Sequence, residues 1–262
     1  GLMSVTTQAV PIYQQPKYLS RDTVPAPTER LAEGEFEPVL EGIQTEMARA
    51  RNQYLDIQEQ VLEGKGEEAE AEYEEMLDQF EMEQARFERG KDLLLDDSNT
   101  ELRAAFESLN RTFAEEFENW RLFQIVFIVM SIPDMGSQCG IVDTESDTLD
   151  VCDIIFFPTG GGKTEAYLGL VTFTAFLDRL RGKNHGLTAL TKFPLRLLSL
   201  QQLQRIANTL CTAEKIRREH PEMGGEEFSV GYFVGKQNTP NGIFEDNGEI
   251  NNVELAANSE QH

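Results

Sequence analysis

One stretch decides the fold expected from this sequence: Asp153-Ile-Ile-Phe-Phe-Pro-Thr-Gly-Gly-Gly-Lys-Thr-Glu165. The apolar run 151–157 has the length of one strand in a buried parallel sheet. Pro158 ends the run because it cannot donate a ladder hydrogen bond. The three glycines that follow allow positive φ and a close approach of the backbone to a ligand. An amphipathic helix then begins at the Lys-Thr pair, and this order of elements predicts a loop that cradles phosphate groups.

Each residue type in the loop suits one task at a nucleoside triphosphate. Backbone amides and the helix N-terminus hold the phosphates, the lysine reaches the β and γ groups, and the threonine hydroxyl binds Mg²⁺. We therefore predict ATP and Mg²⁺ as cofactors, with Lys163 and Thr164 as catalytic residues and Thr164 as the metal ligand. The alternative is a glycine-rich turn with an incidental Lys-Thr pair. The predicted nucleotide-binding residues of the loop are Thr159, Gly160, Gly161, Gly162, Lys163 and Thr164.

The charge of the chain is strongly acidic but unevenly distributed. The formal net charge is −23 at pH 7, which by itself argues against a nucleic-acid partner. Residues 63–89 contain eleven acidic and three basic residues, whereas residues 179–218 contain nine Lys and Arg and one Glu. Because a polyanion responds to the local potential, the basic stretch after the glycine loop keeps DNA binding open.

Cysteine usage and hydropathy indicate a cytoplasmic protein. The three cysteines, Cys139, Cys152 and Cys211, show no C-x-x-C spacing, which favours a reducing compartment without disulfides or a zinc site. Cys152 is expected to be buried in the strand before the loop. The longest apolar run, 122–132, is too short to span a bilayer, and the first residues lack the core of a signal peptide. We expect a soluble, cytoplasmic protein without a membrane partner.

Apolar residues recur at helical spacing through the first half of the chain. Between 43 and 61, and again between 69 and 87, they alternate at intervals of three and four around a Gly-Lys-Gly corner. This pattern predicts an antiparallel hairpin of two helices with acidic outer faces. A third helix is expected from the capping-box spacing Ser98-Asn-Thr-Glu101. An apolar helix at 121–130 and a polar loop at 133–150 complete this half.

The second half alternates between helical patterns and short apolar runs. After the glycine loop we expect a helix to residue 181, a strand at 187–193, a long helix at 194–219 and a strand at 228–235. Together with the strand before the loop, these segments predict a βαβαβ unit. The predicted fold class is therefore α/β, with a parallel sheet and right-handed crossovers.

The sequence Pro-Thr-Gly-x-Gly-Lys-Thr at 158–164 resembles motif I of superfamily 2 helicases and translocases, although the general P-loop has Gly where this chain has Phe157. Upstream, Arg121-Leu-Phe-Gln124 is similar to the glutamine motif of these enzymes. The resemblance implies that Gln124, with Arg121 beside it, binds the nucleotide at its adenine. An amide suits that edge because it offers both a donor and an acceptor. The alternative is an ordinary glutamine at the start of a helix.

The sequence suggests a second helicase motif within the basic stretch. Pro194-Leu-Arg-Leu-Leu-Ser-Leu-Gln201 is similar to motif Ia, with Leu195 and Leu197 in place of its Thr and Glu. That resemblance implies contacts from Arg196 and Gln201 to the DNA backbone, since a guanidinium can bind phosphate through two hydrogen bonds. The alternative is the plain start of an amphipathic helix.

More than half of the chain resembles the DrmA family, the helicase subunits of the bacterial DISARM anti-phage system. The resemblance implies a partial RecA-like P-loop lobe and an ATP-dependent DNA helicase or translocase that acts on phage DNA beside other subunits of the defence system. Two alternatives remain: a non-catalytic nucleotide- or partner-binding assembly module, and a P-loop ATPase that acts on protein. The segments that carry the resemblance are Arg86-Phe-Glu-Arg-Gly90, 104–110, Trp120-Arg-Leu-Phe-Gln124, 156–169, 195–202 and 235–241.

Two parts of a complete helicase are not found in the sequence. No Asp-Glu pair that could serve as motif II occurs, and no second lobe follows. Because phosphoryl transfer needs all these parts together, we expect an N-terminal fragment that is inactive alone. The expected divisions are a flexible lead-in at 1–33, the acidic hairpin plus third helix at 34–119, an incomplete first RecA-like lobe at 120–244 and an acidic tail at 245–262.

Overall fold

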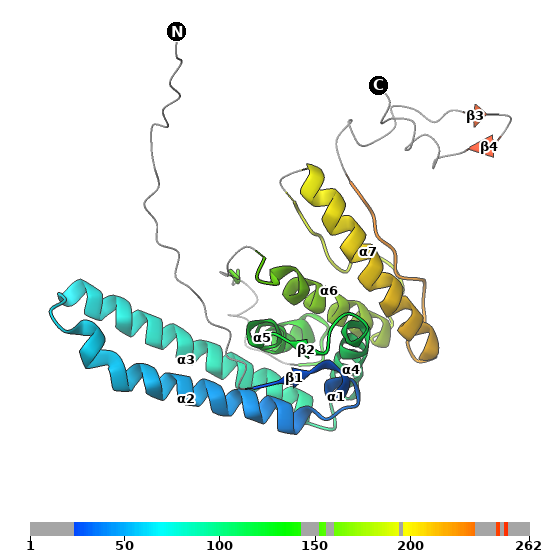
Figure 1. The fold of residues 1–262 in the computed structure, drawn as a ribbon. Coiled ribbons are helices and arrows are strands. Elements are labelled where there is room, and N and C mark those ends of the chain that lie inside the picture. The colour runs from blue at the N-terminus through cyan, green and yellow to red at the C-terminus, as the bar shows by residue number, and fades with distance from the viewer. Residues whose placement is uncertain are drawn as a thin grey trace, which may run out of the picture.

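The computed structural model describes residues 24–142, 152–155, 160–193, 196–233, 245–246 and 249–250. This part of the chain is mainly helical (Figure 1). Its only strands are two antiparallel pairs of two residues each, β1 (Ala26–Pro27) with β2 (Asn119–Trp120) and β3 (Glu245–Asp246) with β4 (Glu249–Ile250). The helices are α1 (Thr28–Ala32), α2 (Phe36–Leu62), α3 (Glu67–Leu95), α4 (Thr100–Ala114), α5 (Leu122–Gln138), α6 (Lys163–Leu180) and α7 (Arg196–Glu219).

The predicted α/β fold with a parallel, RecA-like sheet is wrong. The described parts of its three expected strands, 152–155, 187–193 and 228–233, have no regular secondary structure. Ile154, Leu190 and Phe233 are 85%, 84% and 103% exposed, and Cys152 is exposed rather than buried. A strand satisfies its backbone groups only through a neighbouring ladder. Within the described residues these segments have no such neighbour, so their apolar runs do not form a sheet.

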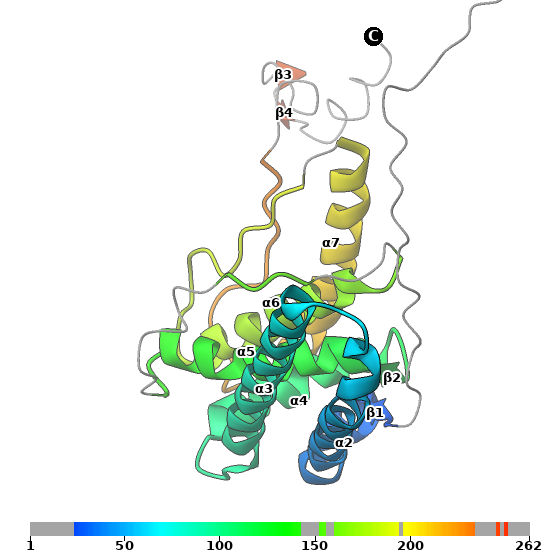
Figure 2. The same cartoon turned by 90° about the vertical axis from the view of Figure 1, so that its left-hand side faces the viewer.

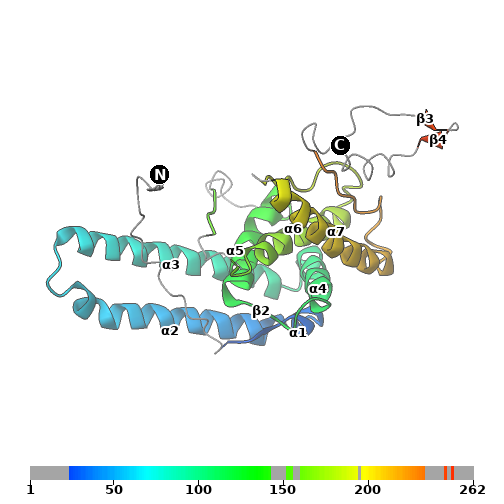
Figure 3. The ribbon, with the colours of Figure 1, turned by 45° about the horizontal axis from the view of Figure 1, so that its top comes forward.

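The two long helices predicted in the first half are present as an antiparallel hairpin. α2 and α3 pack against each other and are joined by the turn at 63–66. Tyr54 and Phe80 meet edge to face with ring centroids 5.8 Å apart, and the Tyr73 hydroxyl donates to the Tyr54 carbonyl oxygen. The outer half of the hairpin, residues 48–82, contains a single buried residue, Leu77. We call this half the arm, because it projects from the other helices (Figures 1 and 3).

Residues 26–32, part of the expected lead-in, belong to the folded body. The Thr28 hydroxyl is buried and lies 2.8 Å from the Phe117 carbonyl oxygen and 3.0 Å from that of Glu118. Leu31 is fully buried. These contacts fasten β1 and α1 to the segment after α4, whereas residues 1–23 of the expected lead-in lie outside the described part.

The core is formed by α4, α5 and α6, with the inner half of α3 packed on α5 and with α7 packed on α4 and α6 (Figure 2). The α4 stripe of Leu102, Phe106, Leu109 and Phe113 is fully buried, as its helical spacing predicts. Trp120 packs beside Phe113 and Phe117, with ring centroids 4.8 Å from each. Its indole N–H donates to Asn110 Oδ1 at 2.7 Å, which satisfies the one polar group of a buried ring.

α5 begins one residue after the start of the predicted helix 121–130 and ends eight residues after its end. At its start, the Arg121 backbone N–H donates to the Gln124 side-chain oxygen, as in one half of a capping box. The capping box predicted at 98–101 is not formed, because α4 begins at Thr100 without a side-chain cap. At its end, α5 continues through Pro133 to Gln138, where a loop was predicted.

Candidate functional site

The glycine loop ends where α6 begins. Gly160 and Gly162 have φ of +79° and +88°, a left-handed conformation that favours glycine. Gly162 is the N-cap residue of α6, and Lys163 and Thr164 are its first two residues. The first amides of α6 and the positive end of its dipole therefore face the loop. Thr159 lies outside the described residues.

Two side chains at the start of α5 hold this loop by its carbonyl groups. Arg121 Nη1 donates to the Gly161 oxygen at 2.5 Å, and Gln124 Nε2 donates to the Gly162 oxygen at 2.7 Å. We call Arg121 and Gln124 the clamp. Gln124 is 3% exposed, and its Oε1 accepts the Arg121 backbone N–H at 2.9 Å. Both ends of its amide are thus used within the chain, and the adenine contact implied by the resemblance stays a prediction.

The clamp has a consequence for the amide groups of the loop. A trans peptide directs its C=O and N–H in opposite directions, and the described chain contains no cis peptide bond. Since the Gly161 and Gly162 carbonyls point to α5, the N–H groups of Gly162 and Lys163 point away from it. Consecutive amides that point the same way form an anion-binding nest. The clamp therefore gives these two N–H groups the arrangement of such a nest.

Glu165, the third residue of α6, connects the start of that helix to α7. Its Oε1 forms an ion pair with Arg205 of α7, whereas its Oε2 is buried and has no hydrogen-bond partner among the described residues. This oxygen lies close to the loop, since a Cβ on Gly162 would be 3.2 Å from it. A buried acceptor without a donor is costly. A Mg²⁺-bound water or a ribose hydroxyl would satisfy it, so the residues present fit a magnesium nucleotide.

The residues predicted to bind DNA lie on α7. Arg196 is the first residue of that helix, with its side chain outside the described part, and Gln201 is exposed. The neighbouring Gln202 is buried and accepts a hydrogen bond from the Tyr167 hydroxyl at 2.9 Å, which links α7 to α6. Sequence reasoning missed the pairs Glu165–Arg205 and Tyr167–Gln202. Three of these four residues lie in segments that carried the resemblance, but no local spacing signals a contact between positions 35 or 40 residues apart.

Much of the positive charge in the basic stretch 179–218 is used inside the protein. Arg181 pairs with Glu101, Lys183 with Asp178, and Arg205 with Glu165. Arg179 donates to the carbonyl groups of residues 183 and 226 and lies over the Phe228 ring. Lys192 and Lys215 are exposed. The basic face expected from the sequence is therefore smaller than the count of Lys and Arg predicts.

Near the end of α7, Glu214 binds two further arginines of the basic stretch. It pairs with Arg217 and Arg218 and accepts the Phe228 backbone N–H at 3.1 Å. Its side chain is 12% exposed. The Arg217 hydrogen bonds, supported by those from Arg218 and Phe228, lower the pKa of Glu214 to about 2. This cluster fastens the segment after α7 to the helix.

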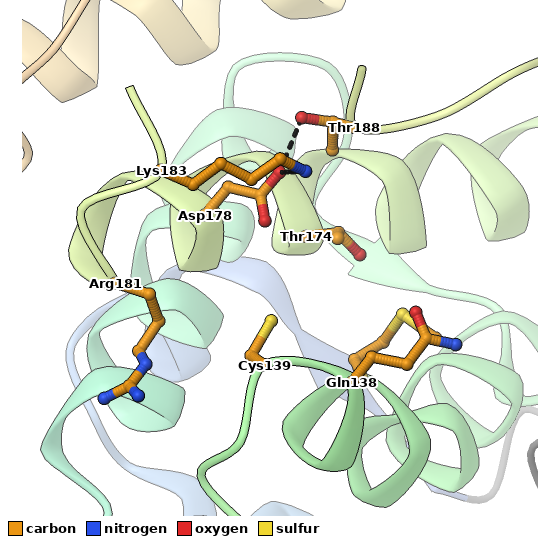
Figure 4. A pocket seen from close by; sticks show the side chains of 8 residues that line it. Gln138, Cys139, Thr174, Asp178, Arg181, Lys183 and Thr188 are labelled. Carbon is orange, nitrogen blue, oxygen red and sulfur yellow. Dashed lines mark hydrogen bonds and ion pairs between the residues drawn. The ribbon is translucent and has the colours of Figure 1, made fainter. Parts of the chain in front are cut away.

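A separate cavity of about 270 Å³ lies between the ends of α5 and α6, away from the glycine loop (Figure 4). Its charged side chains are paired: Asp178 accepts from Lys183 Nζ and Thr188 Oγ1, both at 2.7 Å, and Arg181 pairs with Glu101. Burial raises the pKa of the Cys139 thiol in the same cavity, which makes it a weak nucleophile. These side chains are used within the protein, where they fasten the segment after α6 to that helix and join it to Glu101 of α4, so the cavity is a poor candidate for a charged ligand.

Two classes of feature are absent from the described part of the chain. None of its helices combines the length and apolar character that a bilayer crossing requires. Nor does it contain a group of three or more His, Cys, Asp or Glu side chains that could hold a metal ion. The glycine loop, by contrast, has two orienting hydrogen bonds from the clamp and a buried, unpartnered Glu165 oxygen beside it.

Comparison with known proteins shows what this chain resembles. No protein-family model matches the chain. The chain is 34% identical over 185 residues to a protein of Bacillus paralicheniformis, and the match covers 60% of this chain and 16% of the relative. The chain thus spans a small part of that relative's length. The relative is the DISARM protein DrmA, and it is this protein that the chain resembles.

Proposed function

We propose that the protein is a component of an anti-phage defence system and contributes the phosphate-binding loop of an ATP-driven DNA helicase or translocase. The observation that carries the proposal is the clamp at the start of α6. Arg121 and Gln124 hold two loop carbonyls and so turn the N–H groups of Gly162 and Lys163 away from α5. The similarity to DrmA supports the defence context, with other subunits of that system and phage DNA as partners.

Each residue of the loop has a defined part in this function. The N–H groups of Gly162 and Lys163 and the start of α6 bind the phosphates, and the Lys163 ammonium neutralises their charge. The Thr164 hydroxyl holds Mg²⁺. When bound, ATP and Mg²⁺ supply the phosphoryl group and the charge neutralisation that its transfer requires. Arg196 and Gln201, on the helix that Glu165 and Tyr167 contact, bind the DNA backbone.

The test is Lys163→Ala in the complete protein. Loss of the ammonium should lower DNA-stimulated ATP hydrolysis by at least about 100-fold, because phosphoryl transfer depends on positioned positive charge. Lys192→Ala, which removes an exposed lysine outside the loop, should leave turnover unchanged. Normal turnover in the Lys163 variant would remove the enzyme proposal. If hydrolysis occurs but DNA fails to stimulate it at low salt, the ATPase acts on protein instead.

A second candidate, a non-catalytic assembly module, is favoured by the arm. The arm projects from the body (Figure 3) and exposes Leu55, Ile57, Met76 and Met82 to between 39% and 62%. Large apolar side chains on a projecting element are typical of a contact surface. Deletion of residues 48–82 separates the candidates. A module loses its partner in co-purification and is indifferent to ATP, whereas an ATPase keeps its nucleotide affinity.

A further inference from the structure

Arg86 connects the base of the hairpin to the chain that leads into the glycine loop. Its Nη1 donates to Asp153 Oδ1 at 2.6 Å, and its Nη2 donates to Asp153 Oδ2 at 2.9 Å. Nη2 also reaches Asp134 Oδ2 of α5 at 3.3 Å. The two parallel bonds to Asp153 make this a bidentate pair, which fixes direction as well as distance. One side chain of α3 thus holds both α5 and the segment 152–155.

The surroundings of Arg86 make the contact depend on its charge. The side chains of Arg86 and Asp134 are 17% and 14% exposed, and that of Asp153 is 37% exposed. The hydrogen bonds from Arg86 lower the pKa of Asp153. Glu83, one turn earlier on α3, has its pKa raised by burial, with Arg86 opposing that effect. A single guanidinium therefore offsets part of the negative charge of Asp134 and Asp153, and a neutral residue in its place removes the partner that these two carboxylates share.

Asp153 and the clamp bracket the glycine loop. Asp153 precedes Gly161, the first residue that the clamp holds, by eight residues, so the two anchored points are separated by at most about 29 Å of chain. Arg86 is on α3 and the clamp is on α5. These helices are in tight contact, since a Cβ on Gly90 would lie 1.9 Å from the Val129 carbonyl oxygen. Both anchors therefore belong to one packed unit, and a loop fixed at both ends loses less entropy when it binds a ligand.

We propose that Arg86 is a positioning residue of the nucleotide site, which fixes the upstream end of the glycine loop through Asp153 and so couples the hairpin to nucleotide binding. This inference rests on the proposed function. Because coupling is reciprocal, a bound nucleotide strengthens the Arg86–Asp153 pair as much as the pair strengthens nucleotide binding. The hairpin is then both a projecting surface and a support of the loop.

The experiment measures the affinity of the complete protein for a fluorescent ATP analogue with Mg²⁺. Arg86→Ala is expected to weaken binding roughly threefold to thirtyfold, the effect of losing one partly exposed charge-assisted pair. The matched control is Arg51→Ala, which removes another ion pair of the hairpin, with Glu81, in the arm. It should leave affinity unchanged. Asp153→Asn, a mild change at a half-exposed position, should weaken binding like Arg86→Ala and keeps the test valid if the arginine variant folds poorly.

The double variant Arg86→Ala with Asp153→Asn distinguishes positioning from general support of the fold. If Arg86 acts through Asp153, the double variant binds as weakly as Arg86→Ala alone and no weaker. Multiplied losses, or unchanged affinity in Arg86→Ala or Asp153→Asn, would overturn the inference while the proposed function stands. Absence of nucleotide binding by the unaltered protein is the separate result that overturns the proposed function, and this inference with it.

Discussion

Gly162 is the residue at which the loop, the clamp and α6 meet. Its φ is +88°, and a Cβ would lie 2.7 Å from Gln124 Nε2. Gly160 has a similar φ of +79°, but no atom of the described residues lies within 4 Å of its Cβ position. A comparison of the two glycines separates two effects of substitution by alanine. Both positions impose backbone strain, and only at Gly162 does the new Cβ also collide with the clamp.

We therefore expect Gly162→Ala to lower the free energy of unfolding more than Gly160→Ala does. Strain alone should cost about 1–2 kcal/mol at either position, and displacement of Gln124 should add about 1–2 kcal/mol at Gly162. Urea denaturation followed by circular dichroism measures both values. Equal losses in the two variants would contradict the described contact between Gly162 and Gln124.

The sequence singled out residues that the structure brings together, but it did not predict the contacts between them. Arg121 and Gln124 were singled out through a resemblance that implied a nucleotide contact, and the structure places both against loop carbonyls. Spacing along a helix indicates which face a side chain occupies. It does not indicate which backbone atom it meets 38 or 40 residues away. The pair Arg86–Asp153 was missed for the same reason.

At the scale of elements, α7 shows how charge fastens a helix end. Glu214 has a folded pKa of about 2, below its ordinary 4.5. Because the folded state favours the charged form, this carboxylate stabilises the protein fully above about pH 4.5, and the contribution is lost as the pH falls toward 2.

Glu214→Gln should therefore destabilise the protein at neutral pH, by about 1–3 kcal/mol, and flatten the dependence of stability on pH between 4.5 and 2. Thermal unfolding across that range is the measurement. Glu219→Gln is the control on the same helix, since Glu219 forms an exposed pair with Arg111 and such pairs contribute little. An unchanged acid profile in the Glu214 variant would show that the cluster does not stabilise the fold.

The sequence predicted the helices of this protein more reliably than its strands. A stripe such as Leu102, Phe106, Leu109 and Phe113 defines a helix by its own periodicity. A short apolar run such as 187–193 becomes a strand only if a neighbouring strand supplies the ladder, and this cannot be read from the run itself. Leu187 and Leu190 are instead 69% and 84% exposed. The loop predicted from Pro133 onward is wrong for a similar reason. α5 continues through this proline because the surrounding packing supports the helix there.

At the scale of the whole molecule, burial is unequal between the body and the arm. The arm has one buried residue, whereas α4 alone has eight. Local stability follows buried apolar contacts. We expect amide hydrogens of residues 48–82 to exchange much faster than those of α4 and α6, as measured by hydrogen–deuterium exchange. Equal protection would mean that the arm is covered in solution, for example by a partner or a second copy.

The position of Trp120 gives the protein a built-in optical reporter. It is the single tryptophan of the chain, is 3% exposed among phenylalanine rings, and is bonded directly to Arg121 of the clamp. Selective excitation of indole therefore reads one place in the molecule, at the strand β2 that precedes α5. Its emission colour follows the polarity around the ring, so a rearrangement at the start of α5 is visible without any label.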